Sequence, residues 1–157
     1  MKAWIRTAAL AVLGAVLVAA SFATLAAAVP SPAQHFPLIP VGGEPLKTGF
    51  VEVIHPNGPQ VYARHVYELN GAGSNQSYEV VISIWTSSRA CSGAPEFAIP
   101  AAVIVTNASG NGHADVAFDP ELMAAFGLRG LTIGGNVTVY HEGALAYTTG
   151  CKVIQLD

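Results

Sequence analysis

The chain has 157 residues, a formal net charge of −3 and a composition in which 52% of the residues are hydrophobic. It contains only seven Lys and Arg residues, and their scatter along the chain disfavours a phosphate-neutralising surface for nucleic acid. The same shortage of cations disfavours attachment to an anionic membrane surface.

The N-terminal segment has the features of an export signal. Two basic residues, Lys2 and Arg6, precede an uncharged apolar stretch that runs from residue 7 to residue 25. Small residues follow at Ala26 and Ala28, the positions that a signal peptidase requires. We therefore expect residues 1–28 to be a signal peptide and the remainder to be secreted, that is, extracytoplasmic.

A membrane anchor that is not cleaved, with the domain outside, is the alternative. The apolar stretch spans 25 − 7 + 1 = 19 residues, close to the roughly 20 that cross a bilayer as a helix. Its Ala-rich composition weakens retention in the membrane and favours cleavage. Cleavage leaves 157 − 28 = 129 residues, enough for one domain, and changes the formal net charge to 5 − 10 = −5.

Residues 29–46 differ in composition from the rest of the chain. They contain five prolines and a Gly-Gly pair. This composition is typical of an extended, partly polyproline-II segment without a packed core of its own. The sequence thus predicts a linker over residues 29–46 and a folded domain over residues 47–157.

Short β-rich runs separated by turn residues fill the predicted domain. The clearest run, Ser77–Trp85, alternates so that Tyr78, Val80, Ile82 and Ile84 share one face. The turn signals divide the domain into about seven expected strands, at residues 48–55, 61–69, 77–85, 97–107, 113–118, 131–141 and 145–156.

One short helix is expected between two of these strands. Asp119 offers a capping side chain, Pro120 suits the first helical position, and Glu121 places an acid in the first turn. Gly127 is placed to end the helix, which has two turns at most. It therefore connects strands and does not form a layer.

This succession of elements predicts an all-β fold, an antiparallel β-sandwich of immunoglobulin-like architecture. A small closed barrel is the alternative. True immunoglobulin domains have a Cys…Trp…Cys order, whereas Trp85 precedes the first cysteine of this chain. The similarity therefore concerns the architecture and does not indicate membership of that family.

The two cysteines, Cys91 and Cys151, are expected to form a disulfide. An even cysteine count in an exported chain is typical of disulfide pairing. A metal pair or a catalytic thiol is disfavoured because neither cysteine belongs to a C-x-x-C motif or lies beside a histidine. The bridge would tie the loop after the third expected strand to the last strand.

Three residues are candidate metal ligands. His113 and Asp115 are two residues apart in an expected strand and so share a face. With His141 from a neighbouring strand they could supply three ligands. No His-x-His motif strengthens this pattern, and we expect no cofactor.

Aromatic residues offer a lead to a binding surface. In the second expected strand, Tyr62 and Arg64 share one face, while His65 and Tyr67 share the other. One of these pairs must face outward. Trp85 lies on the face opposite the Tyr78–Ile84 stripe, where it either contributes to a binding surface or shields the disulfide.

These observations disfavour an enzyme and favour binding. The chain has no Gly-x-Ser-x-Gly motif and no evident pair of catalytic carboxylates. We expect a secreted or surface-tethered, non-enzymatic β-sandwich that binds an extracellular or envelope ligand through loops at one end, or that serves as a structural module of the envelope. A secreted metal-binding protein or metalloenzyme that uses His113, Asp115 and His141 is the alternative.

Overall fold

A computed structural model describes residues 33–54 and 63–156 of the chain. The predicted signal peptide, Tyr62 and the turn after the first expected strand lie outside these residues. Within the described residues, no helix is long and apolar enough to cross a membrane.

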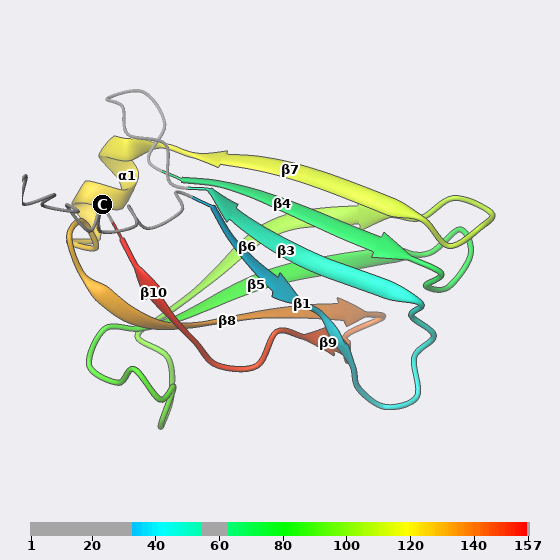
Figure 1. The fold of residues 1–157 in the computed structure, drawn as a ribbon, viewed down its shortest axis with the longest axis horizontal. Helices are drawn as coiled ribbons and strands as arrows, with labels where there is room; N and C mark the ends of the chain where they lie inside the picture. The colour runs from blue at the N-terminus through cyan, green and yellow to red at the C-terminus, as the bar shows by residue number, and fades with distance from the viewer. Residues whose placement is uncertain (1–32, 55–62, 157) are drawn as a thin grey trace, which may run out of the picture. The chain divides into compact units, whose positions relative to one another are not determined.

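The strands form two antiparallel sheets, so the fold is all-β, as predicted (Figure 1). The first sheet has four strands in the order β1-β3-β4-β7: β1 (Ala33–Pro37), β3 (Thr48–Ile54), β4 (Ala63–Asn70) and β7 (Gly112–Phe118). The second sheet has six strands in the order β2-β9-β8-β5-β6, and the sixth, β10, also pairs with β8: β2 (Ile39–Pro40), β9 (Ala144–Thr148), β8 (Thr132–His141), β5 (Ser77–Trp85), β6 (Phe97–Val105) and β10 (Lys152–Gln155).

The alternation of side chains places one face of each sheet in a shared core. The expected stripe of β5, which comprises Tyr78, Val80, Ile82 and Ile84, is buried throughout. In β4, the buried residues are Ala63, His65, Tyr67 and Leu69, so the face of Arg64 is the outward one.

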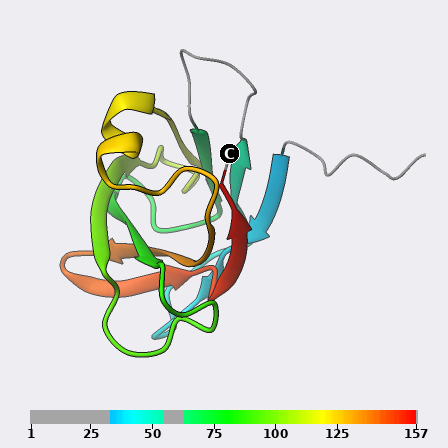
Figure 2. The same cartoon turned by 90° about the vertical axis from the view of Figure 1, so that its left-hand side faces the viewer.

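The predicted helix is present as α1 (Pro120–Ala125). The Asp119 carboxylate accepts a hydrogen bond of 2.7 Å from the backbone N–H of Glu121, as expected of a cap. Gly127, with φ of 65°, follows the helix in the left-handed conformation that favours glycine. The helix lies at the end of the sandwich where the C-terminus also lies (Figures 1 and 2).

The structure differs from the prediction in the range 29–46. Residues from Ala33 onward form β1, which pairs with β3, and β2, which pairs with β9. The five prolines and the Gly-Gly pair predicted an extended segment without a packed core of its own. Both strands lie at sheet edges, where a missing donor removes no ladder hydrogen bond.

The last expected strand is also interrupted. Residues 149–151 separate β9 from β10, although both strands pair with β8. At the interruption, the buried Thr149 hydroxyl accepts a hydrogen bond from the backbone N–H of Val137 at 3.0 Å. The next residue but one, Cys151, forms the disulfide, so the bridge is attached where the strand is interrupted.

Candidate functional site

The three predicted metal ligands do not come together. His113 and Asp115 lie on the outer face of β7 in the four-stranded sheet, whereas His141 ends β8 in the six-stranded sheet. In the part of the chain that the structure describes, no group of three His, Cys, Asp or Glu residues could hold a metal ion. The spacing of these residues in the sequence suggested a site. Spacing alone does not show which sheet a strand joins, and the two strands belong to different sheets.

Each of these residues instead has a partner of its own. Asp115 pairs with Arg64, whose Nε lies 2.8 Å from Asp115 Oδ1 and whose terminal nitrogen contacts Oδ2. The hydrogen bonds from Arg64 lower the pKa of Asp115 below its ordinary value, and those to Asp115 raise the pKa of Arg64. His113 Nδ1 lies 2.6 Å from Glu68 Oε1, directly across the strand pair.

His141 connects three segments at one end of the sandwich. Its Nδ1 lies 3.1 Å from Glu44 Oε1, and its Nε2 lies 3.1 Å from Gln76 Oε1. The ring also stacks near Tyr78, with ring centroids 5.0 Å apart. These contacts join the β2–β3 and β4–β5 connections to the end of β8, so His141 holds loops in place.

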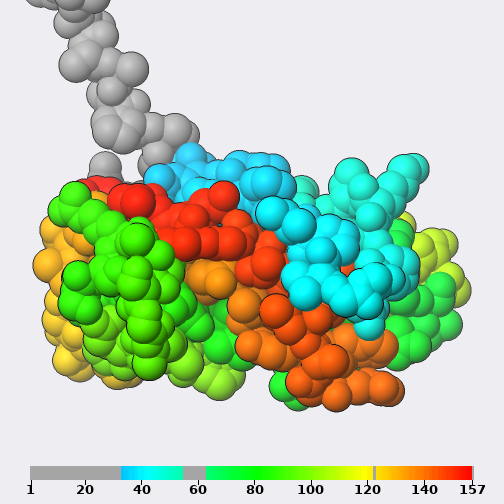
Figure 3. All heavy atoms as spheres, turned by 90° about the horizontal axis from the view of Figure 1, so that it is seen from below, coloured from blue at the N-terminus to red at the C-terminus, as the bar shows by residue number. Residues whose placement is uncertain are grey.

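Cys91 and Cys151 form the disulfide, with Cα atoms 5.8 Å apart. The bridge joins the β5–β6 loop, residues 86–96, to the interruption between β9 and β10, and this loop lies against the C-terminal strand (Figure 3). A Cβ on Gly134 would lie only 2.3 Å from the Ser88 carbonyl oxygen. The loop therefore rests on the backbone of β8, and the absence of a side chain at this position permits the contact.

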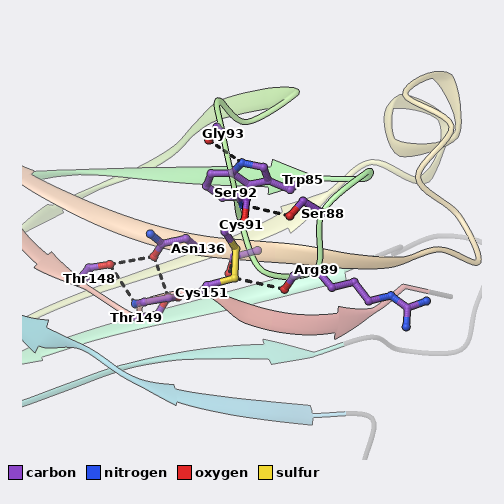
Figure 4. The surroundings of a disulfide bond; sticks show 12 residues. Trp85, Ser88, Arg89, Cys91, Ser92, Gly93, Asn136, Thr148, Thr149 and Cys151 are labelled. Carbon is purple, nitrogen blue, oxygen red and sulfur yellow. Dashed lines mark hydrogen bonds between the residues drawn. A yellow bond between two sulfur atoms is a disulfide. The ribbon is translucent and has the colours of Figure 1, made fainter.

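The β5–β6 loop covers Trp85. This residue is only 7% exposed, and its indole N–H donates a hydrogen bond of 3.1 Å to the Gly93 carbonyl. It lies beside the disulfide, as Figure 4 shows. Of the two roles considered for Trp85, the geometry supports shielding of the disulfide over an exposed binding residue.

The outer face of the four-stranded sheet is charged. Arg64 and Glu68 of β4 point outward beside His113 and Asp115 of β7, and Glu52 of β3 shares this face. Most of these side chains are engaged in the ion pairs described above. A charged, solvated face of this kind is ordinary for an antiparallel sheet that covers a core on one side.

The outer face of the six-stranded sheet is nearly uncharged. One row across the strands runs from Val103 through Glu79 and Tyr140 to Leu145. A neighbouring row begins at Pro100 and Val81 and continues through Thr138, Thr148 and Ile39. The outward side chains of this face are mixed, because Ser77, Glu79 and Ser83 of β5, Asn136 and Thr138 of β8 and Thr148 of β9 are polar. We call its apolar members, with Tyr140, the apolar face: Ala98, Pro100, Val103 and Val105 of β6, Val81 of β5, Tyr140 of β8 and Leu145 of β9.

The side chains of β6 make this face unusual. Val103 is 58% exposed and Val105 is 68% exposed. Along the outward positions of β5, β6, β8 and β9, Glu79 is the single charged side chain among the described residues. Exposed apolar side chains that gather on one face of a protein can mark an interaction surface.

The sequence analysis did not identify this face, although a signal was present. The stretch Phe97–Val105 reads FAIPAAVIV and contains no polar residue. A strand with one face in water usually alternates polar and apolar residues. The continuous apolar run therefore indicated either burial on both faces or an exposed apolar surface, and the exposure of the outward β6 side chains in the structure distinguishes the two.

A shallow groove of about 500 Å³ lies beside Val105, between the ends of β6 and β7. Its walls include the His113–Glu68 pair and two asparagines, Asn107 and Asn111. The Asn107 side chain accepts hydrogen bonds from the backbone N–H groups of Ser109 and Asn111. The Asn107 side chain and the His113–Glu68 pair of the groove are thus bonded to other groups of the protein.

Comparison with known families, curated proteins and solved structures finds no significant match for this chain.

Proposed function

We propose that this protein is an exported, non-enzymatic binding module with an immunoglobulin-like sandwich. Its contact surface is the apolar face, in place of the end loops expected from the sequence. The observation that carries this proposal is the contrast between the outer faces of the two sheets. The outer face of the four-stranded sheet has two ion pairs among its described residues, whereas the outward positions of β5, β6, β8 and β9 have a single carboxylate, Glu79.

The strand order supports the immunoglobulin-like assignment. If β3 to β9 are given the letters A, B, C, C′, E, F and G, the sheets have the orders A-B-E and C′-C-F-G. Immunoglobulin sandwiches likewise place A, B and E in one sheet and C, F and G in the other, with C′ added beside C in some types. β1 is then an additional strand beside strand A.

Strand β6 is an edge strand, but it is protected against pairing with another strand. Pro100 lies in its middle, and the register with β5 shifts close by, between Val80 and Val81. A proline and a bulge are two devices by which proteins discourage edge-to-edge pairing. Binding therefore uses the side chains of the apolar face and not the backbone of β6.

The partner that fits this surface is an extracytoplasmic protein with an uncharged apolar patch. The exported chain has a formal net charge of 5 − 10 = −5, so close approach through its other faces would bring many charges near the partner. Through the apolar face, Glu79 is the one charged side chain of the described β5, β6, β8 and β9 positions that must lose water. Burial of apolar area then provides the driving force.

The test compares wild type with a Val103→Lys/Val105→Lys variant. Each protein is recovered from the medium of a secreting culture, where mass spectrometry is expected to find an N-terminus at Val29. Both are immobilised and exposed to an envelope extract of the source organism. Wild type should retain a defined protein, and the variant should lose at least tenfold of it, because two buried ammonium groups oppose the contact.

Val153→Lys is the matched control, since Val153 is a similarly exposed valine of the same sheet on β10, away from β6. It should retain the same protein as wild type. Equal retention by the Val103→Lys/Val105→Lys variant would refute the apolar face as the contact surface. An intact Met1 would refute cleavage of the signal.

A further inference from the structure

Strand β7 forms one free edge of the four-stranded sheet (Figure 1). Of the described strands, β4 alone pairs with it. Every second residue of an edge strand directs its backbone N–H and C=O groups away from its neighbour, where they can pair with another strand. The backbone of β7 is therefore a template for one more strand.

The other three strands that end the two strand orders contain a proline, whereas β7 does not. Pro37 lies in β1, Pro40 in β2 and Pro100 in β6. β7 has seven residues without proline or lysine, and its register with β4 runs without a bulge. Proteins ordinarily protect an exposed edge by such devices, because an open edge invites pairing. This edge is therefore the one that another strand can join.

The inward side chains of β7 are incompletely covered. Ala114, Val116 and Phe118 pack against the core, yet each is only half-buried. The inward side chains of the neighbouring strand β4 are buried throughout. The core is thus partly open along the free edge of β7. A further strand there would cover apolar surface and also provide partners for backbone groups.

The charged residues of β7 are complementary to those of a second copy of the same strand. In an antiparallel pair centred on Ala114, that residue lies opposite its own copy, and His113 lies opposite Asp115 of the second copy. The two-fold axis repeats the contact, so two such pairs form. Registers centred on His113 or on Asp115 would instead place like side chains opposite each other, which is destabilising.

Both side chains have capacity left for this contact. His113 uses Nδ1 to bind Glu68, and its Nε2 has no hydrogen-bond partner among the residues that the structure describes. The His113 side chain is 52% exposed, and that of Asp115 is 33% exposed. A carboxylate can accept about four hydrogen bonds, so Asp115 can hold Arg64 and also accept one from the second copy. Charges of opposite sign then alternate across the joined sheets.

We propose that β7 is a dimerisation strand, through which two copies of the exported domain pair in antiparallel orientation in the register centred on Ala114. The pairing joins the two four-stranded sheets into one continuous sheet. It uses a sheet edge and leaves the outer faces of both sheets uncovered. The inference therefore does not rest on the function proposed for the apolar face.

The first test is sedimentation equilibrium of the exported domain at about pH 5.5, below the ordinary pKa of histidine of about 6.5. Wild type should show a reversible monomer–dimer equilibrium. His113→Glu should weaken dimerisation at least tenfold, because it places two acids opposite each other. His35→Glu is the matched control and should dimerise as wild type does. His35 is exposed in β1, at the other edge of the same sheet, and it lies opposite Glu52 as His113 lies opposite Glu68.

The second test fixes the register and does not depend on charge. Ala114→Cys should form a disulfide between two copies under mild oxidation, since directly opposite residues have Cα atoms about 4.5–5.5 Å apart, within the range of a disulfide. Ala117→Cys, on the exposed outer face of β7, is the control. In the proposed register its two copies lie roughly 20 Å apart along the strands, so it should not cross-link although position 117 is the more exposed.

Wild type that stays monomeric up to about 1 mM would overturn the proposal. Equal losses of dimer in the two His→Glu variants, or equal cross-linking of Ala114→Cys and Ala117→Cys, would also overturn it. Val103→Lys/Val105→Lys should leave the dimer unchanged. A dimer that this variant dissociates and that His113→Glu leaves intact would place the contact on the apolar face and refute the role of β7.

Discussion

Arg64 and Asp115 form the best-defined ion pair of the charged sheet face. Arg64 holds the carboxylate through two of its nitrogens, a geometry that suits guanidinium and carboxylate groups. Both side chains remain in contact with water, with exposed fractions of 51% and 33%. The pair therefore orders the surface of β4 and β7 but contributes little to the free energy of unfolding.

The lowered pKa of Asp115 predicts the pH range in which the pair stabilises the fold. The ionised carboxylate is favoured in the folded state, so its contribution is fully present above the ordinary pKa of an aspartate, about 3.9. It is lost as the pH falls through the lower pKa of the folded state. Urea unfolding should show wild type slightly more stable than Asp115→Asn at pH 7, with the difference shrinking as the pH falls below the ordinary aspartate pKa of about 3.9.

Glu142→Gln is the control for this measurement, because Glu142 lies in the exposed β8–β9 turn. Its stability relative to wild type should vary little over the same pH range. A difference between wild type and Asp115→Asn that persists undiminished at low pH would contradict the role given to the carboxylate.

Strands β1 and β2 show how a proline-rich segment becomes part of a sheet. Leu38 lies between them, is 5% exposed, and donates its backbone N–H to the Gly49 carbonyl at 2.9 Å. The side chain belongs to the same core cluster as Val51 and Tyr147. The segment is thus attached by an apolar anchor as well as by strand pairing.

This anchoring predicts a large difference between two adjacent residues. Leu38→Ala should lower the free energy of unfolding by about 2–5 kcal/mol, because it leaves a cavity in the core. Ile39→Ala, at a position that is 53% exposed, should change it by less than about 0.5 kcal/mol. Denaturant titration measures both, and equal small effects would show that residues 29–46 act as the linker expected from the sequence.

The disulfide acts on the whole molecule, because it closes a loop of 151 − 91 + 1 = 61 residues. That loop contains β6, β7, α1, β8 and β9. Chain entropy for a loop of this length corresponds to about 4 kcal/mol of stability. Such a contribution is a large share of the stability of a small domain.

Replacement of both cysteines by alanine should therefore lower the free energy of unfolding by roughly 4 kcal/mol. It should also release the β5–β6 loop from Trp85, the only tryptophan after the signal. Tryptophan emission should then shift to longer wavelength in the folded variant. Ser92→Ala, in the same loop, should show neither effect, and an unchanged unfolding midpoint in the double variant would refute the stabilising role.

The sequence by itself determined the features that depend on neighbouring residues. Alternation over Ser77–Trp85 predicted a strand with one buried face, and Asp119, Pro120 and Gly127 predicted the helix and its end. The cysteine pair followed from the count and the expected compartment. Each of these signals is complete within a short window or a simple count.

Only the tertiary structure decided which distant segments meet. His141 meets Glu44 across 97 positions of the chain, and it lies in a different sheet from His113 and Asp115. Likewise, the composition of β6 is the same whether the strand is buried on both faces or exposed on one, and the exposure of Val103 and Val105 in the folded protein shows that one face is exposed. Strand pairing depends on the whole chain, because each sheet joins strands that are far apart in sequence.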